Sequence, residues 1–164
     1  RQYGCNYISA MPTNLYGPND NFNLETSHVL PALIRKFHEA KIEKKESVTI
    51  WGTGKPLREF MYVEDLSNAI VFMMENIEAK DLYENGITHL NVGSGKDISI
   101  SDLASLIAEI TEFDGEIVYD SSKPDGTTRK LMDVTRLNLL GWKYKTELKE
   151  GSIKAYNFFK EKYL

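Results

Sequence analysis

One histidine has the position expected of an acid–base residue. His28 lies where a long polar loop meets the predicted start of a helix. The positive end of a helix favours the neutral imidazole, and an ordinary pKa of about 6.5 lets that ring exchange protons near neutral pH. The alternative is a purely structural histidine. We expect His38 to be solvated on a helix flank and His89 to pack at the start of a strand, so neither is assigned chemistry.

Cationic side chains are the second group that could act on a ligand. They adjoin loops rich in glycine or proline, and they are Arg35, Lys36, Lys55, Arg58, Lys123, Arg129 and Lys130. In a chain of net charge −4, such cations suit a diphosphate ligand, because a guanidinium can bind two phosphate oxygens at once. Trp51, beside Gly52, could stack on a base or a sugar. For each residue taken singly, the alternative is an ordinary surface or packing position.

Familiar short motifs are incomplete or badly placed. Gly52-Thr53-Gly54 and Gly93-Ser94-Gly95 lack the third glycine of a dinucleotide fingerprint, so we interpret both as tight turns after strands. Tyr156 and Lys160 have the Tyr-x-x-x-Lys spacing of a short-chain reductase. They lie in the last predicted helix beside two phenylalanines, with no cofactor motif before them, and we interpret Tyr156 as a packing residue.

Strands and helices are predicted to alternate along the chain. We expect strands at residues 6–11, 48–51, 60–63, 89–92 and 115–119, and helices at about 29–40, 64–75, 99–110 and 148–163. Ser27 is the predicted N-cap of the first helix, and Ser99 or Ser101 caps the third. Residues 12–18, with two prolines and a glycine, are predicted to form a loop. The alternation indicates an α/β fold.

The composition excludes several classes of protein. The chain has 164 residues, 41% hydrophobic and 27% charged, as in a globular domain. Its acidity gives no reason to expect a nucleic acid or a membrane partner, and we expect no metal site. The single cysteine, Cys5, forms no disulfide within the chain, which fits the cytoplasm. The first residue is Arg1 rather than methionine, from which we expect a fragment of a longer protein.

Five segments in fixed order carry a resemblance to a known family. They are SAMPTNLYGPNDNF, SHVLPALIRKFHEA, WGTGKPLREFMYVEDL, HLNVGSG and SKPDGTTRKLMDVTRL. NLYGP and the block from Arg58 to Leu66 are typical of extended short-chain dehydrogenases in general. The second and fifth segments are typical of a narrower group of these proteins. Together the five resemble the C-terminal portion of the GDP-L-fucose synthase family, which has a Rossmann-type nucleotide-binding lobe and a small α/β substrate-binding lobe.

The resemblance implies a bifunctional, NADP-dependent enzyme. The family converts GDP-4-keto-6-deoxy-D-mannose to GDP-L-fucose by 3,5-epimerisation and then NADPH-dependent reduction at C4. The resemblance implies that His28 is a catalytic acid near the cofactor and that the loop Pro12, Thr13, Asn14 and Leu15 contacts the cofactor. It also implies that the GDP-sugar is held by Lys36, Trp51, Arg58, Asp125 and Lys130.

The resemblance has consequences for organisation too. Residues 1–18 and about 60–95 would belong to the nucleotide-binding lobe, and about 19–59 and 96–164 to the substrate-binding lobe. The glycine fingerprint, the catalytic serine, the Tyr-x-x-x-Lys pair and the catalytic cysteine would precede Arg1, and Cys5 does not match that cysteine. We therefore expect the chain alone to be inactive, and the family member to be a homodimer. Two alternatives stay open: another extended short-chain epimerase or dehydratase, and a non-catalytic sugar-nucleotide binding module.

Overall fold

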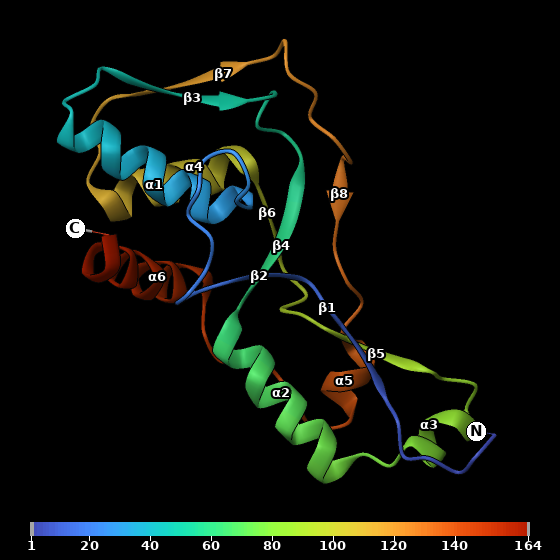
Figure 1. Ribbon diagram of the computed structural model, residues 1–164. Helices are drawn as coiled ribbons and strands as arrows, with labels where there is room; N and C mark the ends of the chain where they lie inside the picture. Colours follow the sequence, from blue (N-terminus) through green and yellow to red (C-terminus); the bar gives the residue numbers. More distant parts are fainter. Residues whose placement is uncertain (1, 164) are drawn as a thin grey trace.

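The computed structural model describes residues 2–163 and has a mixed α/β architecture (Figure 1). The strands are β1 (Ser9–Pro12), β2 (Asn14–Tyr16), β3 (Ser47–Trp51), β4 (Leu57–Tyr62), β5 (His89–Val92), β6 (Asp97–Ser99), β7 (Glu116–Asp120) and β8 (Arg129–Lys130). The helices are α1 (Val29–Ile42), α2 (Val63–Asn76), α3 (Ala79–Glu84), α4 (Ile100–Thr111), α5 (Thr135–Leu139) and α6 (Leu148–Tyr163).

Strand β4 is the central strand of the largest sheet. It pairs in parallel with β2 and with β8, and antiparallel with β6. Two further parallel pairs, β1 with β5 and β3 with β7, lie on either side of this sheet along the molecule (Figure 1). Parallel strands need long crossovers, and each of the four parallel pairs within residues 2–163 is joined through at least one helix.

The helices gather at two ends of the molecule around two hydrophobic cores. Helices α1, α4 and α6 lie together at one end, and α2, α3 and α5 at the other (Figure 1). The first core includes Leu30, Ile34, Phe37, Leu103 and Ile107. The second core gathers Met61, Met73, Leu90, Val92, Leu137 and Trp142. Strand β4 contributes Phe60 to the first and Met61 to the second, as the alternation of a strand requires.

Local sequence signals explain the helix boundaries. Ser99 caps α4, its hydroxyl accepting a hydrogen bond from the Asp102 amide, which confirms one of the two caps expected for that helix. Pro31 fits the first turn of α1, where its missing N–H has no intrahelical partner to lose. Helix α6 has the bounds that the sequence predicts.

The structure corrects three local predictions. The strand expected at residues 6–11 is β1, Ser9–Pro12, so it ends on a proline that was expected to be loop. Residues 14–16 were expected to be loop but form β2, because the segment between the two prolines pairs with β4 in register Asn14 to Phe60. Ser27 is not the N-cap of α1. His28 has that position, without a side-chain cap, and the Ser27 hydroxyl is buried without a hydrogen-bond partner. The short elements α3, α5, β6 and β8 were not predicted.

Candidate functional site

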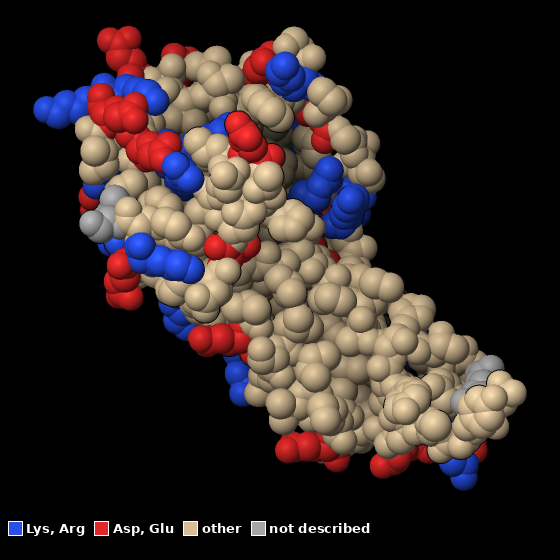
Figure 2. All heavy atoms as spheres, in the orientation of Figure 1, with Lys and Arg blue, Asp and Glu red and all other residues tan. Residues whose placement is uncertain are grey.

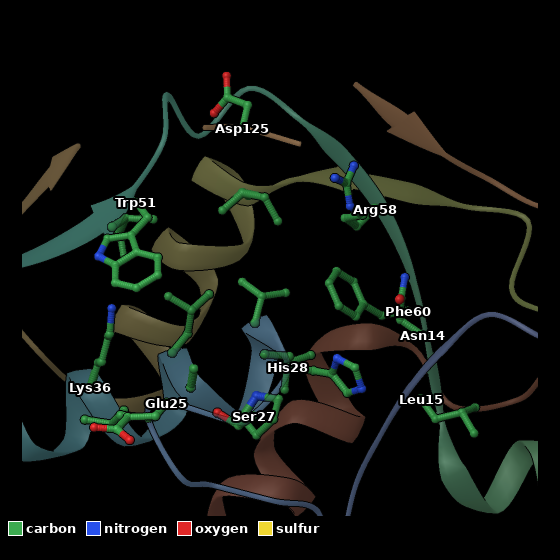
Figure 3. A pocket seen from close by; sticks show the side chains of 18 residues that line it. Asn14, Leu15, Glu25, Ser27, His28, Lys36, Trp51, Arg58, Phe60 and Asp125 are labelled. Atoms are coloured by element: carbon green, nitrogen blue, oxygen red, sulfur yellow. The ribbon is translucent and has the colours of Figure 1, made fainter. Parts of the chain in front are cut away.

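A cavity of about 420 Å³ brings most of the predicted site residues together. It lies between the start of α1, the end of β3 and the side of β4 (Figure 3). Its lining includes seven of the predicted residues: Asn14, Leu15, His28, Lys36, Trp51, Arg58 and Asp125. The other three, Pro12, Thr13 and Lys130, are not among the lining residues.

One side of the cavity is formed by the exposed indole of Trp51 and by Lys36, and a second ammonium group, from Lys123, lies beside the indole. Trp51, at the end of β3, is 69% exposed. The Nζ atoms of Lys36 and Lys123 each lie 5.7 Å from its ring centroid. Burial lowers the pKa of Lys36, whose Nζ donates to the Thr49 carbonyl over 3.4 Å. A flat aromatic surface beside two cations is suited to a planar ring joined to an anionic group.

Arg58 stands on the cavity side of β4 (Figure 3). Its Nη1 donates to the carbonyl of Leu57 over 2.7 Å, which holds the guanidinium close to the strand. A Cβ built on Gly126 would lie 3.7 Å from Nη2, so the turn at residues 125–126 passes next to the guanidinium. Arg58 therefore keeps most of its donors for a ligand while its position is restricted.

The Asp125 carboxylate is bound to the glycine turn that follows β3. Both of its carboxylate oxygens accept hydrogen bonds from Thr53, Oδ1 from the amide over 2.6 Å and Oδ2 from the hydroxyl over 2.7 Å. The amide bond and then the hydroxyl bond lower the pKa of Asp125. A Cβ on Gly52 would meet Oδ1 at 2.3 Å, so the glycine turn and the carboxylate fit together. Asp125 thus fixes the turn after Trp51 and keeps only its remaining lone pairs for a ligand.

His28 lies at the opposite end of the cavity from Trp51 (Figure 3). Its side chain is exposed and projects from the first residue before α1, beside Asn14 and Leu15 of β2. The segment before β2 is anchored by the Thr13 amide, which donates to the Val92 carbonyl over 3.0 Å. This anchor lies at the carboxyl end of the parallel pair β1–β5, the edge at which open α/β sheets bind ligands.

The sequence interpretation missed the apolar wall of the cavity. Phe60, Ile50 and Ile100 line it together with Leu30 and Leu33. A signal for Phe60 was present in the sequence: it lies two residues after Arg58, and residues two apart in a strand share a face. Ile100 had no such signal, because its approach depends on the packing of α4 against the strands.

The other two histidines both differ from expectation. His38 was expected to be solvated but is 5% exposed, and its Nδ1 lies 2.9 Å from the Tyr156 hydroxyl. Helix α6 covers the flank of α1 that a helix taken alone would leave in water. His89 was expected to pack but is exposed, because its side chain faces away from the core that holds Leu90. Tyr156 is 7% exposed within the first core, which confirms its interpretation as a packing residue.

Residues 2–163 contain neither a cluster of metal ligands nor a membrane-spanning helix. No group of three or more His, Cys, Asp or Glu side chains there is arranged to hold a metal ion. No helix in the same range combines the length and the apolar character that crossing a membrane requires.

Comparison with known proteins places these features in a family. Residues 1–93, more than half of the chain, match the NAD dependent epimerase/dehydratase family. The chain belongs to that family. Over 160 residues it is 53% identical to a probable GDP-L-fucose synthase 1 of Oryza sativa subsp. japonica, covering 98% of this chain and 47% of the relative. The chain therefore spans about half the length of the curated relative that it matches.

Solved structures agree with the fold. A GDP-6-OMe-4-keto-L-xylo-heptose reductase from C. jejuni superposes with a TM-score of 0.89 at 40% identity, covering 98% of this chain and 55% of that one. A GDP-L-fucose synthetase from Naegleria fowleri bound to NADP superposes with a TM-score of 0.85 at 30% identity, covering 95% of this chain and 47% of that one.

Proposed function

We propose that this chain is the GDP-sugar-binding portion of a GDP-L-fucose synthase. The observation that carries the proposal is the cavity, around which Lys36 and Trp51 lie on one side and Arg58 and His28 on the other (Figure 3). Sequence identity to a probable synthase supports the choice within the family. The chain itself would bind and orient a GDP-4-keto-6-deoxy sugar.

The cavity suggests how that ligand would lie. The guanine would pack on the exposed Trp51, and the diphosphate would be bound by Arg58 and Lys36. Lys130, Arg58's neighbour on β8, would add charge from outside the cavity. The sugar would then point toward His28 and Asn14 (Figure 3). Interactions with the nucleotide, remote from the reacting carbons, would orient the ring for catalysis.

His28 would move protons in the epimerisation. A ketone at C4 acidifies the hydrogens on C3 and C5, because the resulting negative charge is delocalised onto oxygen. Inverting each carbon needs a base on one face of the ring and an acid on the other. His28 is exposed at the cavity wall and would be the acid, returning a proton to carbon, while the base would come from outside this chain.

NADP would contact only a small part of this chain. When bound, NADPH supplies the hydride for reduction at C4. The segment Pro12–Leu15, held to β5 through Thr13, fits a contact with one end of a dinucleotide. The sequence contains no G-x-G-x-x-G fingerprint to hold the pyrophosphate. We therefore infer that the chain alone binds GDP but does not oxidise NADPH.

The organisation of the chain follows the same proposal. Residues 1–18 and about 60–95 would contribute to a nucleotide-binding lobe, and about 19–59 and 96–164 to a substrate-binding lobe. The enzyme would be a cytoplasmic homodimer, and exposed Cys5 suits a reducing compartment.

Calorimetric titration tests the proposal directly. The purified chain should bind GDP, bind GMP more weakly because it lacks the second phosphate, and bind UDP more weakly because the base differs. Preference for UDP would instead favour a sister epimerase, and no binding of any nucleotide would contradict the assignment of the cavity.

A second candidate function is a GDP-heptose C4 reductase, favoured by the TM-score of 0.89 to the C. jejuni reductase. Both candidates bind GDP, so the titration cannot separate them. A protein that joins this chain to the first half of the rice relative would separate the two candidates. The joined protein should epimerise and reduce the 6-deoxy-4-keto substrate, whereas a reductase would reduce without exchanging the hydrogens at C3 and C5. Binding without either reaction would favour a non-catalytic module.

A further inference from the structure

Glu59 is a fully buried carboxylate next to Arg58 in strand β4. It has no exposed surface, and the alternation of the strand directs it to the face opposite Arg58. Removing a carboxylate from water is unfavourable unless hydrogen bonds replace the lost hydration. The burial of Glu59, beside Arg58 in the same strand, therefore requires hydrogen-bond donors that replace water.

The donors to this carboxylate come from two separate segments. Oε1 accepts from the Gly95 amide over 2.7 Å and from the Ser94 hydroxyl over 3.4 Å. Oε2 accepts from the Met132 amide over 2.9 Å. One oxygen thus binds the glycine turn after β5, and the other binds the chain that leaves β8.

The glycine turn is shaped to receive this carboxylate. A Cβ on Gly93 would meet Oε1 at 2.3 Å, so that position admits no larger residue while Glu59 lies there. This contact accounts for Gly93, and a φ of 70° accounts for Gly95, without a nucleotide phosphate. It also confirms the interpretation of the segment as a turn.

The main chain of Glu59 holds a third segment. Its carbonyl accepts from Asn14 Nδ2 over 2.7 Å and from the Thr13 hydroxyl over 3.3 Å. Strand β8, which ends two residues before Met132, pairs Lys130 with Arg58. Glu59 therefore contacts the start of β2, the glycine turn and the segment that follows Lys130.

We propose that Glu59 is a positioning residue for nucleoside diphosphate binding. By holding the Met132 amide, its carboxylate keeps the segment of residues 125–130 against β4 and thereby orders the surroundings of Arg58. This proposal rests on the proposed function, since it takes the diphosphate as the ligand of Arg58. Glu59 itself does not face the cavity.

The test is Glu59→Gln, with Glu116→Gln as the control at an exposed strand glutamate. The glutamine side chain keeps one acceptor oxygen. Its NH₂ group faces a backbone N–H that has thereby lost its acceptor. We expect the affinity for GDP to fall about tenfold, on the scale of one charged hydrogen bond. The affinity for GMP should fall less, and Glu59→Asp should restore part of the loss. Equal losses for GDP and GMP would mean general destabilisation and would overturn the proposal.

Hydrogen exchange without ligand gives an independent measurement. In Glu59→Gln the amides of residues 93–95 and 125–132 should exchange faster, while those of α1 should not change. Unchanged exchange at residues 125–132 would overturn this inference alone. Failure of the wild-type chain to bind GDP would instead contradict the proposed function, and the exchange measurement would still show whether Glu59 holds the segment.

Discussion

Arg58 and Lys130 are register partners in the adjacent parallel strands β4 and β8. Directly paired residues share a face of a sheet, so both cationic side chains rise on the same side. The sequence separates them by 72 positions, and only the pairing of β8 with β4 brings them together. Of the two, Arg58 lines the cavity and Lys130 adds charge beside it.

Replacing Arg58 with lysine should weaken GDP binding although the charge is kept. A guanidinium can make two parallel hydrogen bonds to phosphate, which an ammonium cannot reproduce. We expect a loss of about 1–3 kcal/mol for Arg58→Lys and a larger loss for Arg58→Ala, measured by calorimetry. Arg136→Lys, at an exposed arginine of α5, is the charge-matched control. If all of these proteins bind GDP equally, Arg58 is ordinary surface charge.

GDP should change the fluorescence of Trp51 specifically. Trp51 is exposed at the cavity, whereas Trp142 is 5% exposed and donates to Asn68 Oδ1 over 2.9 Å. Stacking of a base on the indole should quench emission in the wild-type chain, and Trp51→Phe should abolish the quenching. Persistence of the signal in Trp51→Phe would exclude stacking at this residue.

The stability of the chain should fall in mild acid because of His38. Burial, and then the charge of Lys41, lower the pKa of His38, with Lys160 acting in the same direction and Glu39 opposing it. Its Nε2 is buried without a hydrogen-bond partner. The folded state thus binds the proton less readily than the unfolded state, whose histidine pKa is about 6.5. The stabilisation present above that pH is therefore lost as the pH falls through it.

Denaturant titrations at pH 7.5 and at lower pH measure this effect. We expect the free energy of unfolding to decrease as the pH falls below the unfolded pKa, and the decrease to end once the pH is below the folded-state pKa of His38. His38→Gln, which keeps a polar group for the Tyr156 hydroxyl, should flatten the dependence, whereas His89→Gln at an exposed position should not. The same slope in wild type and His38→Gln would assign the effect to other groups.

His28→Gln should impair catalysis rather than binding. In the protein that joins this chain to the first half of the rice relative, epimerisation should slow by a factor of about 10² to 10⁴, as is typical for general acids and bases. Incorporation of solvent deuterium at C3 and C5 reports the step, and GDP affinity should stay unchanged. A loss confined to substrate affinity would make His28 a binding residue only.

Much of the local structure could be predicted from the sequence. The apolar stripe of α1, the serine cap of α4 and the whole of α6 depend on contacts between residues close in the chain. The cationic and aromatic residues Lys36, Trp51 and Arg58 could be selected by type and by their neighbouring turns. That these three residues line one cavity depends on the packing of α1 against β3 and β4.

The tertiary structure decided what depends on long-range pairing. Residues 14–16 become a strand because β4 supplies partners 46 positions away, although the local prolines favour a loop. His38 is buried because α6 covers it, and His89 is exposed because its neighbours bury the other face of β5. The structural role of Glu59 could not be predicted from the sequence, for the same reason. Its donors are amides of segments that follow it by 36 and 73 positions, and a backbone amide leaves no signal in residue type.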